Sequence, residues 1–433
     1  LETLPRGYHA SGRESQISTN YRAFPFGFAW NPDGKGRTAV RGGYGIASDR
    51  LFMTPLLEFR NNPPLRADAT LGRQFGTQAL YSLGDVSKPY LGYPVDPALA
   101  LGLDPNNGIR GARVSLRAVN PNLRTSYVHN WFFGVQRDLG RGIIVEANYL
   151  GSAGRKLYNV TNVNRFAGDL LADNLFNGWN PSFSAIDMIE SAGSSIHHGG
   201  TMQIRKLFTA GLTLQGAFTF GKTINDSDDL VSTTAFQNIG NRRAERAVAG
   251  YDVPSKFAWV AVYDLPFFRN TRKLAGAAFG GWQLSSTGIL QAGNPITVFM
   301  SAPWPRGDFN ADGFNNDRPN APGPGTPRGG WRRSDYQKGI FNAADFPTPA
   351  PGADGNLGRN RFRGPGYAQV DLSIAKKFSL TERFTLQFRA DAFNAFNRVN
   401  LNNPVTDLVN NNFGRSVGTQ TPKSYQLGLR VMF

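Results

Sequence analysis

The chain has 433 residues, among them 50 glycines and 27 prolines, and a formal net charge of +16. It contains no cysteine, which excludes cysteine-ligated zinc, iron–sulfur clusters and thiol catalysis. No apolar stretch reaches the roughly 18 residues of a transmembrane helix, so the sequence excludes one. The basic residues are scattered and form no run of about five or six, so we expect no nucleic-acid partner.

Segments of alternating polarity recur along the whole chain. In Leu212–Phe220, large apolar side chains oppose Thr213, Gln215 and Thr219. A helical period would carry the polar residues through the apolar stripe, so this pattern predicts β-strands with one apolar and one polar face. The alternating segments are Tyr21–Trp30, Tyr127–Val135, Leu212–Phe220, Gln369–Phe378, Phe384–Asp391 and Ser424–Phe433.

The connections between strands are of two lengths. The short turns are Asn31–Gly36, Asp138–Gly142, Phe208–Gly211 and Ser379–Glu382, with a longer basic one at Pro266–Gly281. The long polar segments are Asp49–Arg124, Gly151–Gly199, Lys222–Pro254, Ser301–Gly364 and Asn394–Lys423. Short periplasmic turns that alternate with long extracellular loops are typical of outer-membrane barrels. We therefore predict an all-β fold, an antiparallel transmembrane β-barrel of about eleven strands in this chain, with a periplasmic C-terminus.

Six sequence blocks resemble the Oar-like group of TonB-dependent receptors. They are RGGYGI (Arg41–Ile46), YVHNWFFGVQRDL (Tyr127–Leu139), VEANYLGSAGRKL (Val145–Leu157), GWQLSSTGILQAGNPITV (Gly281–Val298), DFNADGFNNDRPN (Asp308–Asn320) and FRADAFNAF (Phe388–Phe396). The blocks occur in the family's order over nearly the whole chain. The resemblance implies a barrel of about 22 strands with a plug domain, which imports a solute with energy delivered by TonB.

The plug domain and the TonB-interacting segment of this family are N-terminal, and neither is visible in the chain. The sequence begins at Leu1 without a signal peptide. We expect residues 1–433 to be the C-terminal portion of the barrel, surrounded by outer-membrane lipid and coupled to TonB through the missing N-terminal part. The expected function is binding of an unknown external solute for TonB-coupled import. The alternative is a structural or adhesive surface barrel without active transport, and no enzymatic function is expected in either case.

The last ten residues resemble the signal that the barrel-assembly machinery reads in outer-membrane proteins. The resemblance rests on polar Gln426, then Gly428, apolar Val431 and the terminal Phe433. The same segment alternates strictly, with Arg430 on the face opposite to Val431. A charge at the lipid midplane costs about 2–4 kcal/mol, so this arginine is expected to face the lumen.

Four tryptophans are expected to anchor the barrel at the membrane interfaces: Trp30, Trp131, Trp259 and Trp282. Girdles of aromatic residues flank the apolar band of outer-membrane barrels at both edges. In a soluble β-sandwich the same residues would serve as ordinary packing residues.

The segment Asp308–Asp317 reproduces the opening of a calcium-binding loop. Asp308, Asn310 and Asp312 supply oxygen atoms at alternate positions, and a glycine follows for the turn. The twelfth position is Pro319 instead of the usual glutamate, so Asp317 would have to replace it. The segment is therefore either a Ca²⁺ loop or an Asn/Asp-rich turn without metal.

Three further motifs are expected to be coincidences. Gly216–Thr223 fits a P-loop pattern but is itself an alternating strand, with an acidic run where a helix should follow. Gly414–Gly418 fits the pattern of a hydrolase nucleophile, yet the segment leads into the last strand. Adjacent His197 and His198 point in different directions and have no third ligand at a suitable spacing.

Overall fold

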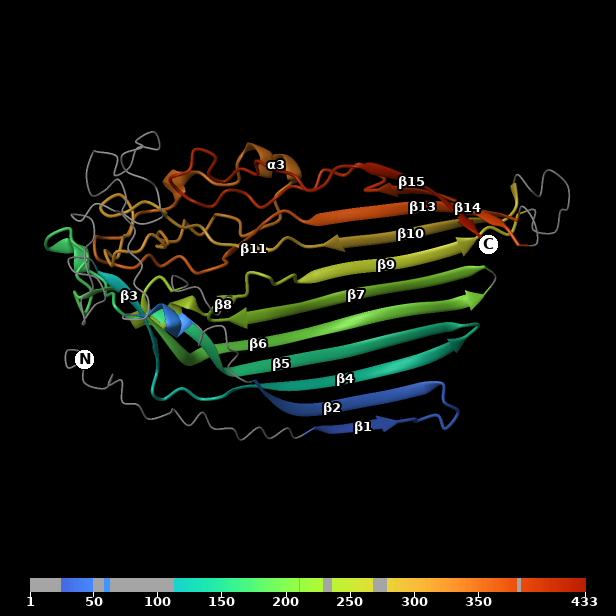
Figure 1. Cartoon of the computed structure of the whole chain (residues 1–433), viewed down its shortest axis with the longest axis horizontal. Coiled ribbons are helices and arrows are strands. Elements are labelled where there is room, and N and C mark those ends of the chain that lie inside the picture. Colours follow the sequence, from blue (N-terminus) through green and yellow to red (C-terminus); the bar gives the residue numbers. More distant parts are fainter. Residues whose placement is uncertain are drawn as a thin grey trace, which may run out of the picture.

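The structure is a computed structural model that describes residues 25–49, 58–62, 113–209, 211–228, 236–267, 279–379 and 383–433. These residues form one large antiparallel sheet whose strands lie side by side, with the long connections gathered at one end and the short turns at the other (Figure 1). We call these ends the loop end and the turn end.

Eleven strands follow one another in the sheet in the order of the sequence. They are β1 (Phe26–Trp30), β2 (Thr38–Asp49), β4 (Ser126–Gly140), β5 (Ile143–Asn162), β6 (Phe183–Thr209), β7 (Leu212–Asn225), β9 (Ser255–Asp264), β10 (Trp282–Gln291), β13 (Tyr367–Ser379), β14 (Thr385–Phe393) and β15 (Ser424–Met432). The prediction of an antiparallel all-β fold with about eleven strands is confirmed. Within the described ranges, the edge strands β1 and β15 each pair on one side only.

Short elements lie at the loop end. They are β3 (Val114–Val119), β8 (Ala247–Val248), β11 (Pro295–Ile296), β12 (Phe362–Arg363), α3 (Arg333–Lys338) and the 3-10 helices η1 (Glu58–Asn61), η3 (Asp169–Leu171), η4 (Ile239–Glu245) and η5 (Ala343–Asp345). The strand β3 runs parallel to the upper part of β6, and β8 extends the pairing of β7. None of the helices in the described part of the chain is long and apolar enough to cross a membrane.

The register of the strands gives the sheet two different faces. Phe218, for example, pairs with Met202 on one side and with Phe257 on the other, so large apolar residues line up across neighbouring strands. The apolar face carries Phe26, Phe28, Phe133, Val135, Met202, Ile204, Phe218, Phe257, Leu284, Leu372, Leu427, Leu429 and Val431. The opposite face carries Arg41, Gln136, Asn148, Gln203, Gln215, Gln283, Asp371, Arg389 and Arg430. One face therefore suits lipid and the other suits water.

Glycines opposite two tryptophans allow close packing on the apolar face. A Cβ atom on Gly151 would lie 2.2 Å from the Trp131 ring, and one on Gly288 would lie 2.1 Å from the Trp259 ring. Each indole thus lies flat against the backbone of the neighbouring strand. Any larger residue at either position would displace the ring.

The predicted loop over Gly151–Gly199 is wrong, because β5 continues to Asn162 and β6 already begins at Phe183. Likewise, Lys222–Asn225 at the start of another predicted loop belongs to β7. These extensions lack the alternation of apolar and polar residues, since polar side chains are buried there: Asn159, Thr161 and Asn162 are at most 3% exposed. On the loop-end side of the apolar band, neither face of the strands contacts lipid, so neither face has to be apolar.

The turn end confirms two tight turns. Gly34 and Gly36 adopt positive φ angles in the turn Asn31–Gly36, as Gly140 and Gly142 do in Asp138–Gly142. Several predicted segments lie wholly or partly outside the described residues: Tyr21–Phe24, most of Asp49–Arg124, and parts of Phe208–Gly211, Pro266–Gly281 and Ser379–Glu382.

Candidate functional site

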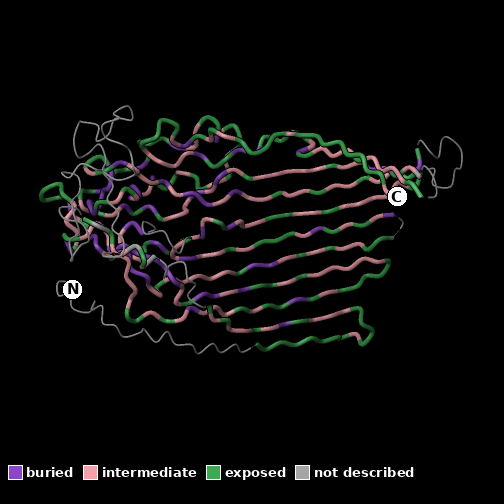
Figure 2. Tube along the Cα trace, viewed as in Figure 1, coloured by how far each residue is buried: buried purple, intermediate pink, exposed green. Residues whose placement is uncertain are grey.

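The loop end is a packed assembly and not a set of separate loops. Buried residues gather there, whereas the strands are mostly half-buried or exposed (Figure 2). Its hydrophobic core consists of Ile296, Val298, Phe341, Phe346, Leu357 and Phe362, with Trp331 and Phe413 packed against it. The core joins residues from segments that are more than a hundred positions apart in sequence. We call this unit the loop assembly.

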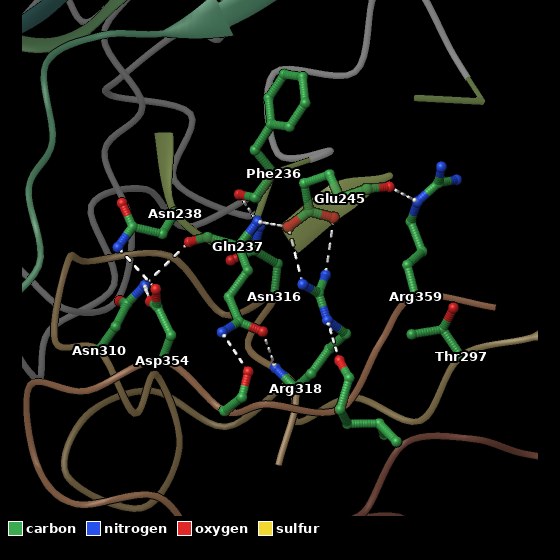
Figure 3. A network of polar contacts seen from close by, with 12 residues as sticks. Phe236, Gln237, Asn238, Glu245, Thr297, Asn310, Asn316, Arg318, Asp354 and Arg359 are labelled. Carbon is green, nitrogen blue, oxygen red and sulfur yellow. Dashed lines mark hydrogen bonds and ion pairs between the residues drawn. The ribbon is translucent and has the colours of Figure 1, made fainter. Parts of the chain in front are cut away.

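An ion pair between Arg318 and Glu245 lies at the centre of the polar contacts (Figure 3). The two guanidinium nitrogens Nη1 and Nη2 each donate to one carboxylate oxygen of Glu245, both at 2.9 Å. Arg318 Nε also donates to the carbonyl oxygen of Leu357, and the backbone N–H of Gln237 donates to Glu245 Oε1. The side chains are 5% and 0% exposed, so the bidentate geometry neutralises two charges that have little contact with water.

Two further arginines attach the loop assembly to the strands. Arg359 Nη1 lies 2.7 Å from Asp228 Oδ2, and Arg359 Nη2 donates to the side-chain oxygen of Asn225, the last residue of β7. Arg363 Nη2 lies 2.7 Å from Asp252 Oδ2 near the start of β9. These contacts fix the long segment before β13 onto the tops of two other strands.

The predicted calcium loop is buried within the assembly. Asp308 accepts hydrogen bonds from the backbone N–H groups of Asp312 at 3.0 Å and Gly313 at 2.9 Å. Asp317 Oδ2 accepts from the N–H of Asn310 at 2.7 Å, while its Oδ1 is buried and has no hydrogen-bond partner. The carboxylates therefore accept hydrogen bonds from backbone N–H groups of their own loop. Asp and Asn side chains favour compact turns through such local bonds.

Three carboxyl groups of this loop have raised pKa values. Burial and, to a smaller extent, repulsion from Asp312 raise the pKa of Asp308 to about 7. Burial likewise raises the pKa of Asp317 to about 8. The pKa of Asp312 reaches about 6 because burial outweighs the attraction of Arg165, whose Nη1 lies 2.9 Å from Asp312 Oδ2. The cluster thus gathers more negative charge than its hydrogen bonds and Arg165 neutralise.

The arrangement differs from a formed metal centre. Among the residues that the structure describes, no group of three or more His, Cys, Asp or Glu side chains has a geometry that could hold a metal ion. Asp308, Asn310, Asp312 and Asp317 lie in one buried loop, as the spacing predicted, but several of their oxygen atoms are directed at backbone amides. The calcium loop stays a prediction.

The four tryptophans lie at different depths on the apolar face. Trp30 ends β1 and Trp282 begins β10, so both lie at the turn end. Trp131 lies nine positions before Gly140, the turn-end residue of β4, and therefore near the far edge of the apolar band. Trp259 is in the middle of β9, where its Nε1 donates to Ser286 Oγ at 3.2 Å. Their role as interface anchors stays a prediction.

The predicted assembly signal occupies the edge strand β15. Gln426 pairs with Asp391 and Gly428 with Arg389 on the polar face, whereas Val431 shares the apolar face. Phe433 follows the strand and is 96% exposed. The signal residues are therefore accessible at an edge of the described sheet.

The structure also describes the three motifs that were expected to be coincidences. Gly216–Thr223 lies entirely within β7, which leaves no loop to surround a phosphate. Ser416, in the hydrolase-like pattern, donates its backbone N–H to the carbonyl oxygen of Tyr336. His197 and His198 lie on opposite faces: His197 Nδ1 contacts Thr223 Oγ1 at 2.9 Å, and His198 Nδ1 contacts the Tyr149 hydroxyl at 2.6 Å.

The arginines of the loop assembly were not predicted from the sequence. Arg165 is 147 positions from its partner Asp312, and Arg318 is 73 positions from Glu245. No local spacing rule identifies such pairs in a chain with 47 basic residues. Alternation in the flanking strands indicated only that long polar segments lie between them.

Comparison with known proteins identifies a family to which the sequence matches. A family model described as "Outer membrane beta barrel domain" matches residues 8–432. No curated protein matches the sequence. Among solved structures, the chain is similar to the outer membrane transporter YddB from Escherichia coli, with 10% identity and a TM-score of 0.49 over 94% of this chain and 40% of that one.

Two other solved structures are similar to a comparable extent. The FrpB iron transporter from Neisseria meningitidis has 10% identity and a TM-score of 0.44 over 95% of this chain and 39% of that one. The siderophore receptor PiuA from Acinetobacter baumannii has 7% identity and a TM-score of 0.42 over 95% of this chain and 35% of that one. The chain thus spans 40% or less of these three proteins.

Proposed function

Because the chain belongs to the outer membrane β-barrel domain family, we propose that it binds an external solute at its loop end and that the intact protein imports this solute with energy from TonB. Its place is the bacterial outer membrane, and its apolar face contacts the lipid there. The proposal treats residues 1–433 as the C-terminal portion of a barrel of about 22 strands. Plug domain and TonB-interacting segment would belong to the part before residue 1.

The observation that supports solute binding is the internal order of the loop assembly. Long loops without function need only be polar and solvated, whereas these have an aromatic core and the buried pair of Arg318 and Glu245. A fixed scaffold holds recognition side chains in place and reduces the entropy lost on binding. The Oar-like group is the receptor class that we propose for the chain.

The proposed orientation places the loop end outside the cell and the turn end in the periplasm. Long extracellular loops and short periplasmic turns are the rule in bacterial barrels. The absence of cysteine from residues 1–433 makes this directly testable. With the intact protein in whole cells, a large maleimide–polyethylene glycol reagent should label Asn411→Cys at the loop end. It should label Lys35→Cys at the turn end only after the outer membrane is permeabilised, and the reverse result would overturn the orientation.

Import is tested in cells that produce the intact protein, with and without TonB. Depletion of a solute from defined medium is followed by mass spectrometry, and a strain without the protein is the control. A solute that disappears only when both the protein and TonB are present supports import.

The second candidate function is a structural or adhesive surface barrel, which is favoured by the size and rigidity of the loop assembly alone. It predicts no TonB-dependent depletion. Adhesion of cells to surfaces or to each other should then fall when the loop assembly is opened by Arg318→Met.

A further inference from the structure

A cavity of about 610 Å³ at the loop end is lined by four arginines. They are Arg155 in β5, Arg242 and Arg243 in η4, and Arg246 directly before β8. Ala192, Ser194, Asp226 and Phe236 complete the lining. We call this cavity the arginine pocket. It is separate from the Arg318–Glu245 pair, because Glu245 ends η4, Arg246 follows it in an extended conformation, and the two side chains reach different partners.

The arginine pocket lies on the same face of the sheet as the lipid-facing residues. Arg155 pairs with Tyr127, which shares its face with Trp131. Ser194, Ile196 and His198 are two positions apart in β6 and therefore share one face. His198 pairs with Gly151, which pairs with Trp131, so this is the face of Trp131. The pocket is thus outside the lumen.

The depth of the pocket matches the edge of the apolar band. Arg155 lies twelve residues after Ile143, the first residue of β5. A tilted strand rises by about 2.5 Å per residue, which places Arg155 about 30 Å from the turn end. The apolar band of an outer-membrane barrel is about 25 Å tall.

Aromatic and imidazole rings on the same face extend from the apolar band up to the pocket, where Tyr127 pairs with Arg155. Tyr44 and Tyr149 contact the imidazoles of His129 and His198 through their hydroxyl groups, both at 2.6 Å. Tyr127 lies edge-on to His129 at 5.3 Å. Tyrosine rings are enriched at the interface between hydrocarbon and head groups, and Tyr127 pairs with Arg155, so we place the pocket at the height of the head groups.

Only part of the pocket's positive charge is neutralised by the protein. Arg246 Nη1 lies 3.1 Å from Asp226 Oδ1 and 2.7 Å from Ser194 Oγ. Arg242 Nη2 lies 2.5 Å from Glu190 Oε2. Arg155 donates to backbone carbonyls, and within the described residues neither it nor Arg243 forms an ion pair with a carboxylate. Two guanidinium groups therefore face a shared cavity without a counter-ion.

We propose that the arginine pocket binds a phosphate group. Planar guanidinium groups donate paired hydrogen bonds that match the oxygen atoms of phosphate, and two such groups without a carboxylate partner match a doubly charged anion. Phosphate is the shared chemistry of the head groups of outer-leaflet lipid A and of free phosphorylated solutes. The height and outward position of the pocket favour the lipid. This inference does not depend on import, but the lipid source depends on the proposed orientation.

The test uses the intact protein, purified in detergent and freed of bound lipid. Binding of bisphosphorylated lipid A is measured by microscale thermophoresis, with dephosphorylated lipid A and inorganic pyrophosphate as the other two probes. The double variant Arg155→Ala/Arg243→Ala is compared with Arg328→Ala/Arg333→Ala, which removes two exposed arginines elsewhere in the loop assembly. Each variant loses two positive charges.

The proposal expects lipid A to bind the unchanged protein, with affinity about tenfold weaker for each arginine lost from the pocket. The control variant should bind as the unchanged protein does, and the dephosphorylated lipid should bind weakly. If lipid A fails to bind but pyrophosphate binds, and this binding is lost in Arg155→Ala/Arg243→Ala, the pocket is assigned to a phosphorylated solute. Equal binding of both lipids, or equal loss in both variants, would overturn the proposal.

Discussion

Replacing Arg318 with methionine removes the guanidinium that neutralises Glu245. The carboxylate is 0% exposed and accepts both strong bonds of the pair, so it would be left buried with only the N–H of Gln237 as partner. Breaking a buried ion pair by removing one member costs about 3–5 kcal/mol. Methionine also loses the bond from Arg318 Nε to the Leu357 carbonyl oxygen, which places the cost near the upper value.

This free energy is read from amide hydrogen exchange in the loop assembly. If the assembly opens as a unit, the N–H groups of residues 237 and 318 should exchange about 10³- to 10⁴-fold faster in Arg318→Met. Amides in β14, which are part of the sheet, should be unchanged. The double variant Arg318→Met/Glu245→Gln removes the uncompensated charge and should recover most of the protection. Unchanged exchange in the single variant, or no recovery in the double variant, would refute the reasoning.

Three other predictions concern the acidic loop, the tryptophan packing and the end of the chain. Burial raises the pKa of Asp308 to about 7 and that of Asp317 to about 8 from 3.8 in both cases, so the folded loop holds protons that the unfolded chain has lost. Stability of the loop assembly against proteolysis should therefore fall as the pH rises from about 4 to about 8. If the loop binds calcium, added Ca²⁺ should restore the stability of the unchanged protein but not that of Asp317→Asn. Gly288→Val should displace the Trp259 ring and lower the barrel's unfolding temperature in detergent, at a cost of about 1–3 kcal/mol, whereas Gly428→Val, where a Cβ meets open space, should not. Removal of the exposed Phe433 should reduce the amount of protein in the outer-membrane fraction several-fold, and normal amounts would contradict its role in assembly.

The sequence predicted the strands well where one face of a strand contacts lipid and the other contacts water. In β7 and β15 the side chains alternate because one face meets lipid and the other meets water, so Leu427 and Arg430 could be assigned to opposite faces without coordinates. Beyond the apolar band this contrast ends, and the extension of β5 to Asn162 carries no alternating signal. The extension was therefore predicted as loop.

Whether a feature is local in the sequence also explains which parts of the candidate site could be predicted. The oxygen-rich loop at Asp308 was visible because its spacing is local, and the structure does place Asp308 and Asp317 in one buried cluster. The pairing of Arg318 with Glu245 depends on how separate loops cross above the sheet. Such a contact follows from tertiary structure alone, and so does the arginine pocket.

The length of β6 has a consequence for what can reach the protein from outside. Its 27 residues correspond to about 90 Å of extended chain, far more than a tilted strand uses to cross hydrocarbon. In the proposed orientation, the part of β6 between Phe183 and Ser194 projects tens of ångströms above the head groups. Residues 186–189 of this part are buried, so antibodies and bacteriophage fibres would meet the exposed residues of the loop assembly around it before they touch the bilayer, and sequence variation under such pressure should concentrate in those residues.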